Sequence, residues 1–202
     1  MVFEKIKRKY GRPFVGDSGE SGFLQKPGGK FYDLGSGTGK PVVAAAILHN
    51  FDKCFGIEIL EGLYSMSLDV AAAYASKGVA RLTEQGRSFV TELQMVRGDM
   101  LAINTESKDA IEEDWTDGDI VFANSTCYDD ELMLKISNTA VGMRKGTFFI
   151  SFTKRLPAPD FKVLEAELHP QSWGAATIYI MQKTTDPREI NDTDGQEEKA
   201  EK

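Results

Sequence analysis

Hydrophobic and polar residues divide the chain into short apolar runs and longer helical stretches. The short runs are bounded by glycines or polar residues, as is typical of buried strands. They span 31–34, 54–59, 89–97, 119–123 and 146–152. Because successive positions in each run are apolar, the strands are predicted to be covered on both faces, as in a parallel sheet. The stretches 41–49 and 61–75 predict helices, with Pro41 suited to a first turn and Gly78 to a stop.

The second half of the chain predicts one strongly amphipathic helix and a hairpin. Acidic residues at 129–131 suit the positive end of the helix, and basic residues at 144–145 suit its other end. The apolar stripe of this helix consists of Leu132, Ile136, Ala140 and Met143. Two further strands, 161–169 and 175–181, are joined by a connection short enough for an antiparallel hairpin. The alternation predicts a doubly wound, Rossmann-like α/β fold with a seven-stranded, mostly parallel sheet, a C-terminal antiparallel hairpin and helices on both faces.

Composition and charge narrow the class of protein. The 202 residues are 41% hydrophobic and 27% charged, which suits one soluble globular domain. Lys and Arg number 24 against 31 Asp and Glu, a net charge of −7, which argues against a protein whose main task is to bind nucleic acid. Cys54 and Cys127 lack metal-ligand spacing, and the apolar runs are too short for a membrane helix. We therefore expect a cytoplasmic or nuclear protein with no metal site and no membrane contact.

The turn after the first strand is the first candidate for chemistry. It reads Asp33, Leu34, Gly35, Ser36, Gly37, Thr38, Gly39. The glycines let the backbone turn tightly and approach a ligand, and the following helix offers its N-terminal amides. The spacing Gly-x-Gly-x-Gly differs from the Gly-x-Gly-x-x-Gly of dinucleotide-binding proteins, which makes a nicotinamide or flavin enzyme the less favoured interpretation. A loop led by an acid suits a cationic ligand.

The next two strand ends also carry acids. Glu58, followed by Ile59, lies 19 residues after Gly39, where a carboxylate can accept both hydroxyls of a ribose. Asp99 and Met100 end the third strand and suit the edge and face of an adenine. Since ligands of such sheets lie outside the carboxyl ends of the strands, the three ends together predict an adenosine site.

This set of motifs resembles class I S-adenosylmethionine-dependent methyltransferases over about residues 31–183. The resemblance implies that the cofactor is S-adenosyl-L-methionine, with S-adenosyl-L-homocysteine as product. It assigns cofactor contacts to Asp33, Gly35, Ser36, Gly37, Thr38, Gly39, Glu58, Ile59, Asp99, Met100 and Asn124. It divides the chain into an N-terminal lead-in and loop at 1–30, the methyltransferase domain at 31–183 and an acidic, disordered tail at 184–202.

A closer resemblance is to the disruptor-of-telomeric-silencing (Dot) family of histone lysine methyltransferases. Its motifs match Asp33 to Gly37, Gly56 to Glu58, Gly98-Asp99 and Val121 to Asn124. Further matches are Met143, Gly146, Ser151, Leu168-His169-Pro170 and Trp173. The chain departs from that family in having about 30 residues before its first strand and no long basic region.

The resemblance implies a protein lysine N-methyltransferase. Asn124 and Tyr128 are the predicted catalytic residues, Asn124 orienting the amine through its side-chain oxygen. Phe152 and Trp173, with Tyr128, are the predicted walls of the substrate channel, although each aromatic residue could equally pack in the core. An apolar channel would favour the neutral amine that attacks the methyl group.

Two alternatives to lysine methylation stay open. One is methylation of a small-molecule amine or a nucleobase, and the other is a degenerate cofactor-binding scaffold without activity. The acids at the strand ends, including 129–131, favour a basic segment of a protein as acceptor and argue against nucleic acid as partner. We expect the acidic stretch 108–119 to lie at the opposite edge of the sheet, and the protein to be a monomer.

Overall fold

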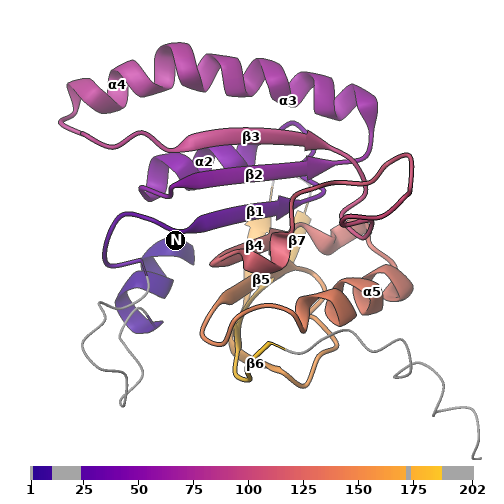
Figure 1. Cartoon of the computed structure of the whole chain (residues 1–202). Helices are drawn as coiled ribbons and strands as arrows, with labels where there is room; N and C mark the ends of the chain where they lie inside the picture. Colours follow the sequence, from indigo (N-terminus) through magenta and orange to yellow (C-terminus); the bar gives the residue numbers. More distant parts are fainter. Residues whose placement is uncertain (1, 11–23, 172–173, 188–202) are drawn as a thin grey trace, which may run out of the picture.

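The computed structural model describes residues 2–10, 24–171 and 174–187, and its centre is one seven-stranded sheet (Figure 1). The strands are β1 (Lys30–Leu34), β2 (Lys53–Glu58), β3 (Glu92–Arg97), β4 (Ile120–Ala123), β5 (Phe148–Phe152), β6 (Phe161–Gln171) and β7 (Gly174–Lys183). Their order is β3-β2-β1-β4-β5-β7-β6. The first five are parallel, while β7 runs antiparallel to both β5 and β6. The predicted Rossmann-like sheet with a terminal hairpin is confirmed.

Side chains alternate between the two faces of the sheet, and each face is buried. Phe31 of β1 packs on one face with Val42 and Ala45 of the next helix. Tyr32, its neighbour, packs on the other face with Ile136 and Trp115. Because both faces bury large apolar residues, the strands need the continuous apolar runs seen in the sequence.

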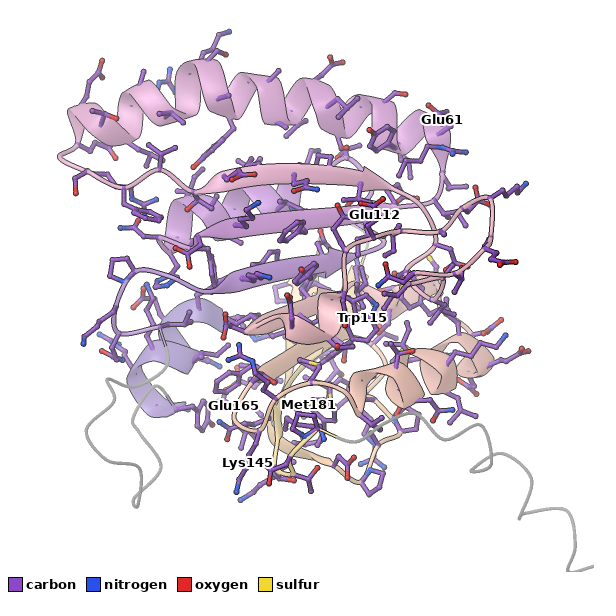
Figure 2. The ribbon with its side chains drawn as sticks, in the orientation of Figure 1. Glu61, Glu112, Trp115, Lys145, Glu165 and Met181 are labelled. Carbon is purple, nitrogen blue, oxygen red and sulfur yellow. The ribbon has the colours of Figure 1, made fainter. Side chains whose placement is uncertain are left out.

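Helices cover the two faces unequally. They are α1 (Val2–Lys5), η1 (Ile6–Tyr10), α2 (Lys40–Leu48), α3 (Glu61–Ala73), η2 (Tyr74–Gly78), α4 (Val79–Glu84) and α5 (Asp130–Ala140), with 3-10 turns η3 (Trp115–Asp117) and η4 (Ser125–Cys127). The helices from α1 to α4 lie on the face of the sheet that contains Phe31, because their residues Ile6, Val42 and Tyr74 belong to the same buried cluster as Phe31. On the other face, α5 and the 98–119 connection, whose buried Trp115 is labelled in Figure 2, cover the sheet.

The helix stop predicted at Gly78 is wrong. The helix continues through Gly78, whose φ of −66° is right-handed, and ends after Glu84. The ring of Tyr74 lies close to Gly78, where a Cβ would be 3.0 Å from Tyr74 Cδ2. The termination occurs at Gly86, where φ is +85°, the left-handed conformation that favours glycine.

Other predicted boundaries shift by a few residues. The third strand begins at Glu92, not at 89. The helix α5 ends at Ala140, where the chain turns, and Arg144 beyond this turn pairs with Asp119. The start of α5 is as expected, since the Asp129 carboxylate accepts a hydrogen bond from the Leu132 amide (2.7 Å).

The N-terminal segment was predicted as a lead-in and loop, but residues 2–10 are helical. Ile6 is fully buried on the sheet, and Lys5 and Lys9 bind Glu165 on β6. Such a short segment has no helical period to recognise, so only its packing on the sheet reveals it. Most of the predicted loop (11–23) and of the predicted tail (188–202) lies outside the described residues.

Candidate active site

The glycine-rich turn between β1 and α2 lies at the carboxyl edge of the sheet, and its three glycines are left-handed. Their φ values are 71°, 54° and 76° at Gly35, Gly37 and Gly39. A Cβ at Gly35 would collide with the Tyr128 hydroxyl, and one at Gly39 would lie 2.8 Å from Met95 Cε. A Cβ at Gly37 would meet nothing within 4 Å. Two of the glycines therefore permit close packing, and the third leaves open space above the turn.

Glu58 joins the end of β2 to this turn. One carboxylate oxygen accepts a hydrogen bond from the Gly37 amide (2.8 Å) and the other from the Leu60 amide (2.9 Å). The residue is only 6% exposed, whereas its neighbour Ile59 is 46% exposed. Each carboxylate oxygen keeps a second lone pair, so the backbone fixes the carboxylate without using all its acceptor capacity.

Asp33 is a buried carboxylate without a partner. It is 1% exposed, and neither oxygen has a hydrogen bond with any residue that the structure describes. Burial, and secondarily the charge of Glu58, raises the pKa of Asp33 well above its ordinary value. The hydroxyl of Ser36, two residues into the turn, is also buried and unpartnered. A cationic group bound here would pair with the Asp33 carboxylate and offset its desolvation, so the turn fits the cationic cofactor that the sequence predicts.

Asp99 is held at the end of β3 by its own backbone and by the 98–119 connection. Its carboxylate accepts a hydrogen bond from the Leu101 amide (2.9 Å), and its amide donates to the Asp109 carbonyl (2.8 Å). The Trp115 indole donates to the Met100 carbonyl (2.7 Å). The stretch 108–119 was expected entirely at the opposite edge, and for Asp109 this is wrong. The chain doubles back here through the Ile103–Ile111 bridge, within a connection that has no helical or strand periodicity to predict it.

Asn124 follows β4 and is exposed at the same edge. Its side-chain oxygen accepts a hydrogen bond from the Thr126 hydroxyl (2.8 Å). The Ser125 hydroxyl, fully buried, donates to the Phe152 carbonyl, while the Thr126 and Thr153 hydroxyls lie 3.1 Å apart. These bonds fix the loop after β4 to the loop after β5, so Asn124 has a defined position.

Tyr128 connects that loop to the glycine-rich turn. Its hydroxyl donates to the Leu34 carbonyl (2.7 Å) and fills the space above Gly35. Burial, reinforced by the charges of Asp33 and Glu58, raises the pKa of Tyr128. The phenol therefore stays protonated, and the geometry makes it a donor that holds two loops together.

Phe152 lines an apolar cavity on the α2 face of the sheet. The cavity has a volume of about 180 Å³, and its walls include Phe3, Phe31, Pro41 and Phe122. Phe122 and Phe152 meet edge to face, with centroids 5.3 Å apart. Phe122 and Phe3, which line the same cavity, were not singled out from the sequence; strand alternation places Phe122 on this face of the sheet, whereas Phe3 belongs to the unpredicted N-terminal helix. Trp173, the other predicted wall, lies outside the described residues.

Solved structures with the same fold include three methyltransferases. An RNA methyltransferase from Salinibacter ruber in complex with S-adenosyl-L-homocysteine is 21% identical, with a TM-score of 0.54 over 81% of this chain and 86% of that chain. TrmN from Thermus thermophilus is 16% identical, with a TM-score of 0.54 over 80% and 46%. A putative RNA methyltransferase from Pyrococcus horikoshii is 16% identical, with a TM-score of 0.51 over 80% and 76%.

The sheet order, the glycine-rich turn and the strand-end acids define a class I S-adenosylmethionine-dependent methyltransferase. The family model "Histone methylation protein DOT1" matches residues 23–171, well over half of the chain. The chain therefore belongs to the DOT1 family, and both predicted resemblances are confirmed. No curated protein matches the chain. None of the helices in the described ranges is long and apolar enough to cross a membrane. The individual site assignments stay predictions.

Proposed function

We propose that the protein transfers a methyl group from S-adenosylmethionine to a lysine amine in a basic segment of another protein. The match to the DOT1 family over residues 23–171, which contain Asn124 and the strand-end acids, carries the proposal. The cofactor supplies an activated methyl group, so the chain has mainly to align a neutral amine and exclude water.

The proposed cofactor contacts follow the strand ends. Glu58, already oriented by two backbone amides, would bind the ribose hydroxyls. Asp33 would pair with the positive charge of the methionine part, and Asp99 would accept from the adenine edge. The open space above Gly37 lets a ligand approach the backbone there.

The proposed acceptor site combines Asn124 with the apolar cavity beside Phe152. A free lysine has a pKa of about 10.4, and an apolar environment disfavours its charged form. No titratable side chain of the described residues lines the cavity. The Asn124 oxygen accepts one hydrogen bond and keeps a second lone pair, with which it would orient the amine.

Fewer acids are free to attract a basic acceptor than the sequence suggests. Asp130 pairs with Lys154 (2.6 Å), Glu131 pairs with Lys135 (2.7 Å) and Asp129 caps α5. Glu58 and Asp99 also accept backbone hydrogen bonds, and neither has an ion-pair partner in the described ranges. The attraction is therefore concentrated near the proposed cofactor, where the reacting amine must arrive.

The test is transfer of labelled methyl groups from S-adenosylmethionine to histones, to a protein extract and to RNA in parallel. We expect label on lysine in protein and none on RNA. Asn124→Ala should lower kcat/KM about 100-fold because the amine loses its alignment. Asn138→Ala, an exposed asparagine on α5, is the matched control and should leave the rate unchanged.

The labelling experiment and calorimetry with S-adenosylhomocysteine together separate lysine methylation from the two alternatives. Label on RNA alone would assign a nucleobase acceptor. Binding without transfer to any acceptor would assign a non-catalytic scaffold. Unchanged transfer by Asn124→Ala would remove that residue from the mechanism.

A further inference from the structure

Three basic side chains converge on a cavity at the amino edge of the sheet, opposite the candidate active site. In Figure 1 this is the end of β1 to β3 from which the arrows point away, where the N-terminal segment and the α4–β3 turn lie. The cavity has a volume of about 270 Å³ and is lined by Lys7, Lys26 and Arg87. No carboxylate of the described residues is among its walls.

None of the three cations pairs with a carboxylate in the described ranges, although the chain has 31 acids. The carboxylates of Asp52 and Asp119 are at this end of the sheet, but each accepts a hydrogen bond from a backbone amide, that of Gly29 (2.9 Å) or Lys30 (2.7 Å). Both carboxylates keep their negative charge, and Asp119 also pairs with Arg144 (2.6 Å), so neither forms an ion pair with the three cations at the cavity.

Helix capping accounts for two of the cations and not for the third. Lys7 donates to the Leu48 carbonyl (3.1 Å), and Arg87 donates to the Ala46 (2.7 Å) and Ile47 (2.5 Å) carbonyls at the end of α2. Lys7 keeps two ammonium protons, and Arg87 keeps further N–H groups. Lys26 makes no hydrogen bond or ion pair with any described residue. Capping of α2 therefore does not explain why Lys26 lies beside the cavity.

The walls are fixed without a ligand. The Gln25 side chain donates to the Lys7 carbonyl (2.8 Å), and the Gly28 amide donates to the Asn50 carbonyl (2.7 Å). Two residues that line the cavity, His49 and Asn50, each have a buried polar atom, Nε2 and Oδ1, with no hydrogen-bond partner in the described ranges. Burial and then the charge of Lys7 lower the pKa of His49 to about 4, so its imidazole is uncharged at neutral pH.

We propose that this cavity binds the phosphate group of a small organic phosphate, held by Lys7, Lys26 and Arg87. Several convergent cationic donors suit the oxygens of a phosphate. Leu24, Pro27 and Leu48 line the same cavity and offer apolar contact to an organic body, which a bare phosphate ion lacks.

The test is a titration of the isotope-labelled full chain, followed by NMR, with glycerol 3-phosphate, inorganic phosphate and glycerol. We expect saturable shifts at the amides of 24–26 and 49–50 with glycerol 3-phosphate, weaker binding of inorganic phosphate and no effect of glycerol. Lys26→Gln should weaken binding about tenfold, since a charge-assisted hydrogen bond is lost. Lys162→Gln, an exposed lysine on the edge strand β6, is the matched control.

Calorimetry with S-adenosylhomocysteine on the same samples should give equal affinities for the unmodified chain and Lys26→Gln, which verifies the fold independently of the phosphate. Absence of saturable shifts, or equal phosphate affinity in Lys26→Gln, would overturn the site. Equal affinity for inorganic phosphate and glycerol 3-phosphate would contradict the proposed contacts between the apolar walls and the organic part of the ligand. The result does not depend on which acceptor the enzyme methylates.

Discussion

The carboxylate of Asp33 shows how one residue can be costly for stability and suited to ligand binding. It is buried near the carboxyl end of β1 and has no hydrogen-bond partner among the described residues. A buried carboxylate without a partner destabilises the folded state. The same unpaired charge is what a cationic ligand would bind, so stability and affinity should respond oppositely when it is removed.

We expect Asp33→Asn to stabilise the cofactor-free protein by about 1 kcal/mol at neutral pH and to weaken binding of S-adenosylhomocysteine. Because the pKa of Asp33 is raised above its ordinary 3.8, the folded state holds this proton more tightly than the unfolded state. Its contribution to stability is therefore full below that value and is lost as the pH rises through the raised pKa.

Thermal unfolding across about pH 4 to 8 would show this as a flatter profile for Asp33→Asn than for the unmodified chain. Asp69→Asn, on the exposed side of α3, should keep the original profile. A loss of stability in Asp33→Asn at every pH would contradict the interpretation.

Tyr128 acts through its hydroxyl, which fixes the loop carrying Asn124 to the end of β1. Tyr128→Phe keeps the ring but leaves the Leu34 carbonyl without this donor, and should cost about 1 kcal/mol of stability. We expect kcat to fall several-fold with little change in KM, since alignment and not binding is lost. Tyr179→Phe is the control, because the Tyr179 hydroxyl has no hydrogen bond within the described residues. Equal kinetics for both variants would leave Tyr128 a packing residue.

The N-terminal segment is held by contacts with residues far away in the sequence. Its cations bind Glu165 on β6, labelled in Figure 2, and the Tyr10 hydroxyl also donates to this carboxylate (2.9 Å). Hydrogen bonds from Lys9, Lys5 and Tyr10 lower the pKa of Glu165 to about 2. A segment of nine residues does not form a stable helix by itself, so these contacts and the burial of Ile6 hold it.

Hydrogen exchange of residues 2–10 should therefore become about three- to tenfold faster in Glu165→Gln. The stabilisation is present above the ordinary pKa of 4.5 and is lost as the pH falls toward the lowered value. The unmodified chain should thus lose the same protection in acid, while Glu84→Gln at the end of α4 should behave like the unmodified chain at neutral pH. Unchanged protection in Glu165→Gln would mean that apolar packing alone holds the segment.

At the scale of the molecule, the net charge of −7 predicts how a basic acceptor is recruited. Salt screens long-range attraction, so kcat/KM for a basic protein acceptor should fall as the ionic strength rises. The affinity for S-adenosylhomocysteine should change much less, because its contacts are short and partly buried. The check is a steady-state salt series beside calorimetry, and a rate that rises with salt would contradict attraction by acids.

The sequence by itself determined the sheet, the glycine-rich turn and the strand-end residues Glu58, Asp99 and Asn124. Apolar runs and left-handed glycines are local properties of the chain, and parallel strands bring their carboxyl ends to one edge. Only the tertiary structure decided the rest: the helix through Gly78, the N-terminal segment, the return of Asp109 to the site, the hydroxyl of Tyr128 above Gly35 and the basic cavity at the opposite edge. Several of these features depend on pairs of residues far apart in the chain, such as Tyr128 with Leu34 and Lys9 with Glu165, and no local pattern records which distant partner a side chain will meet.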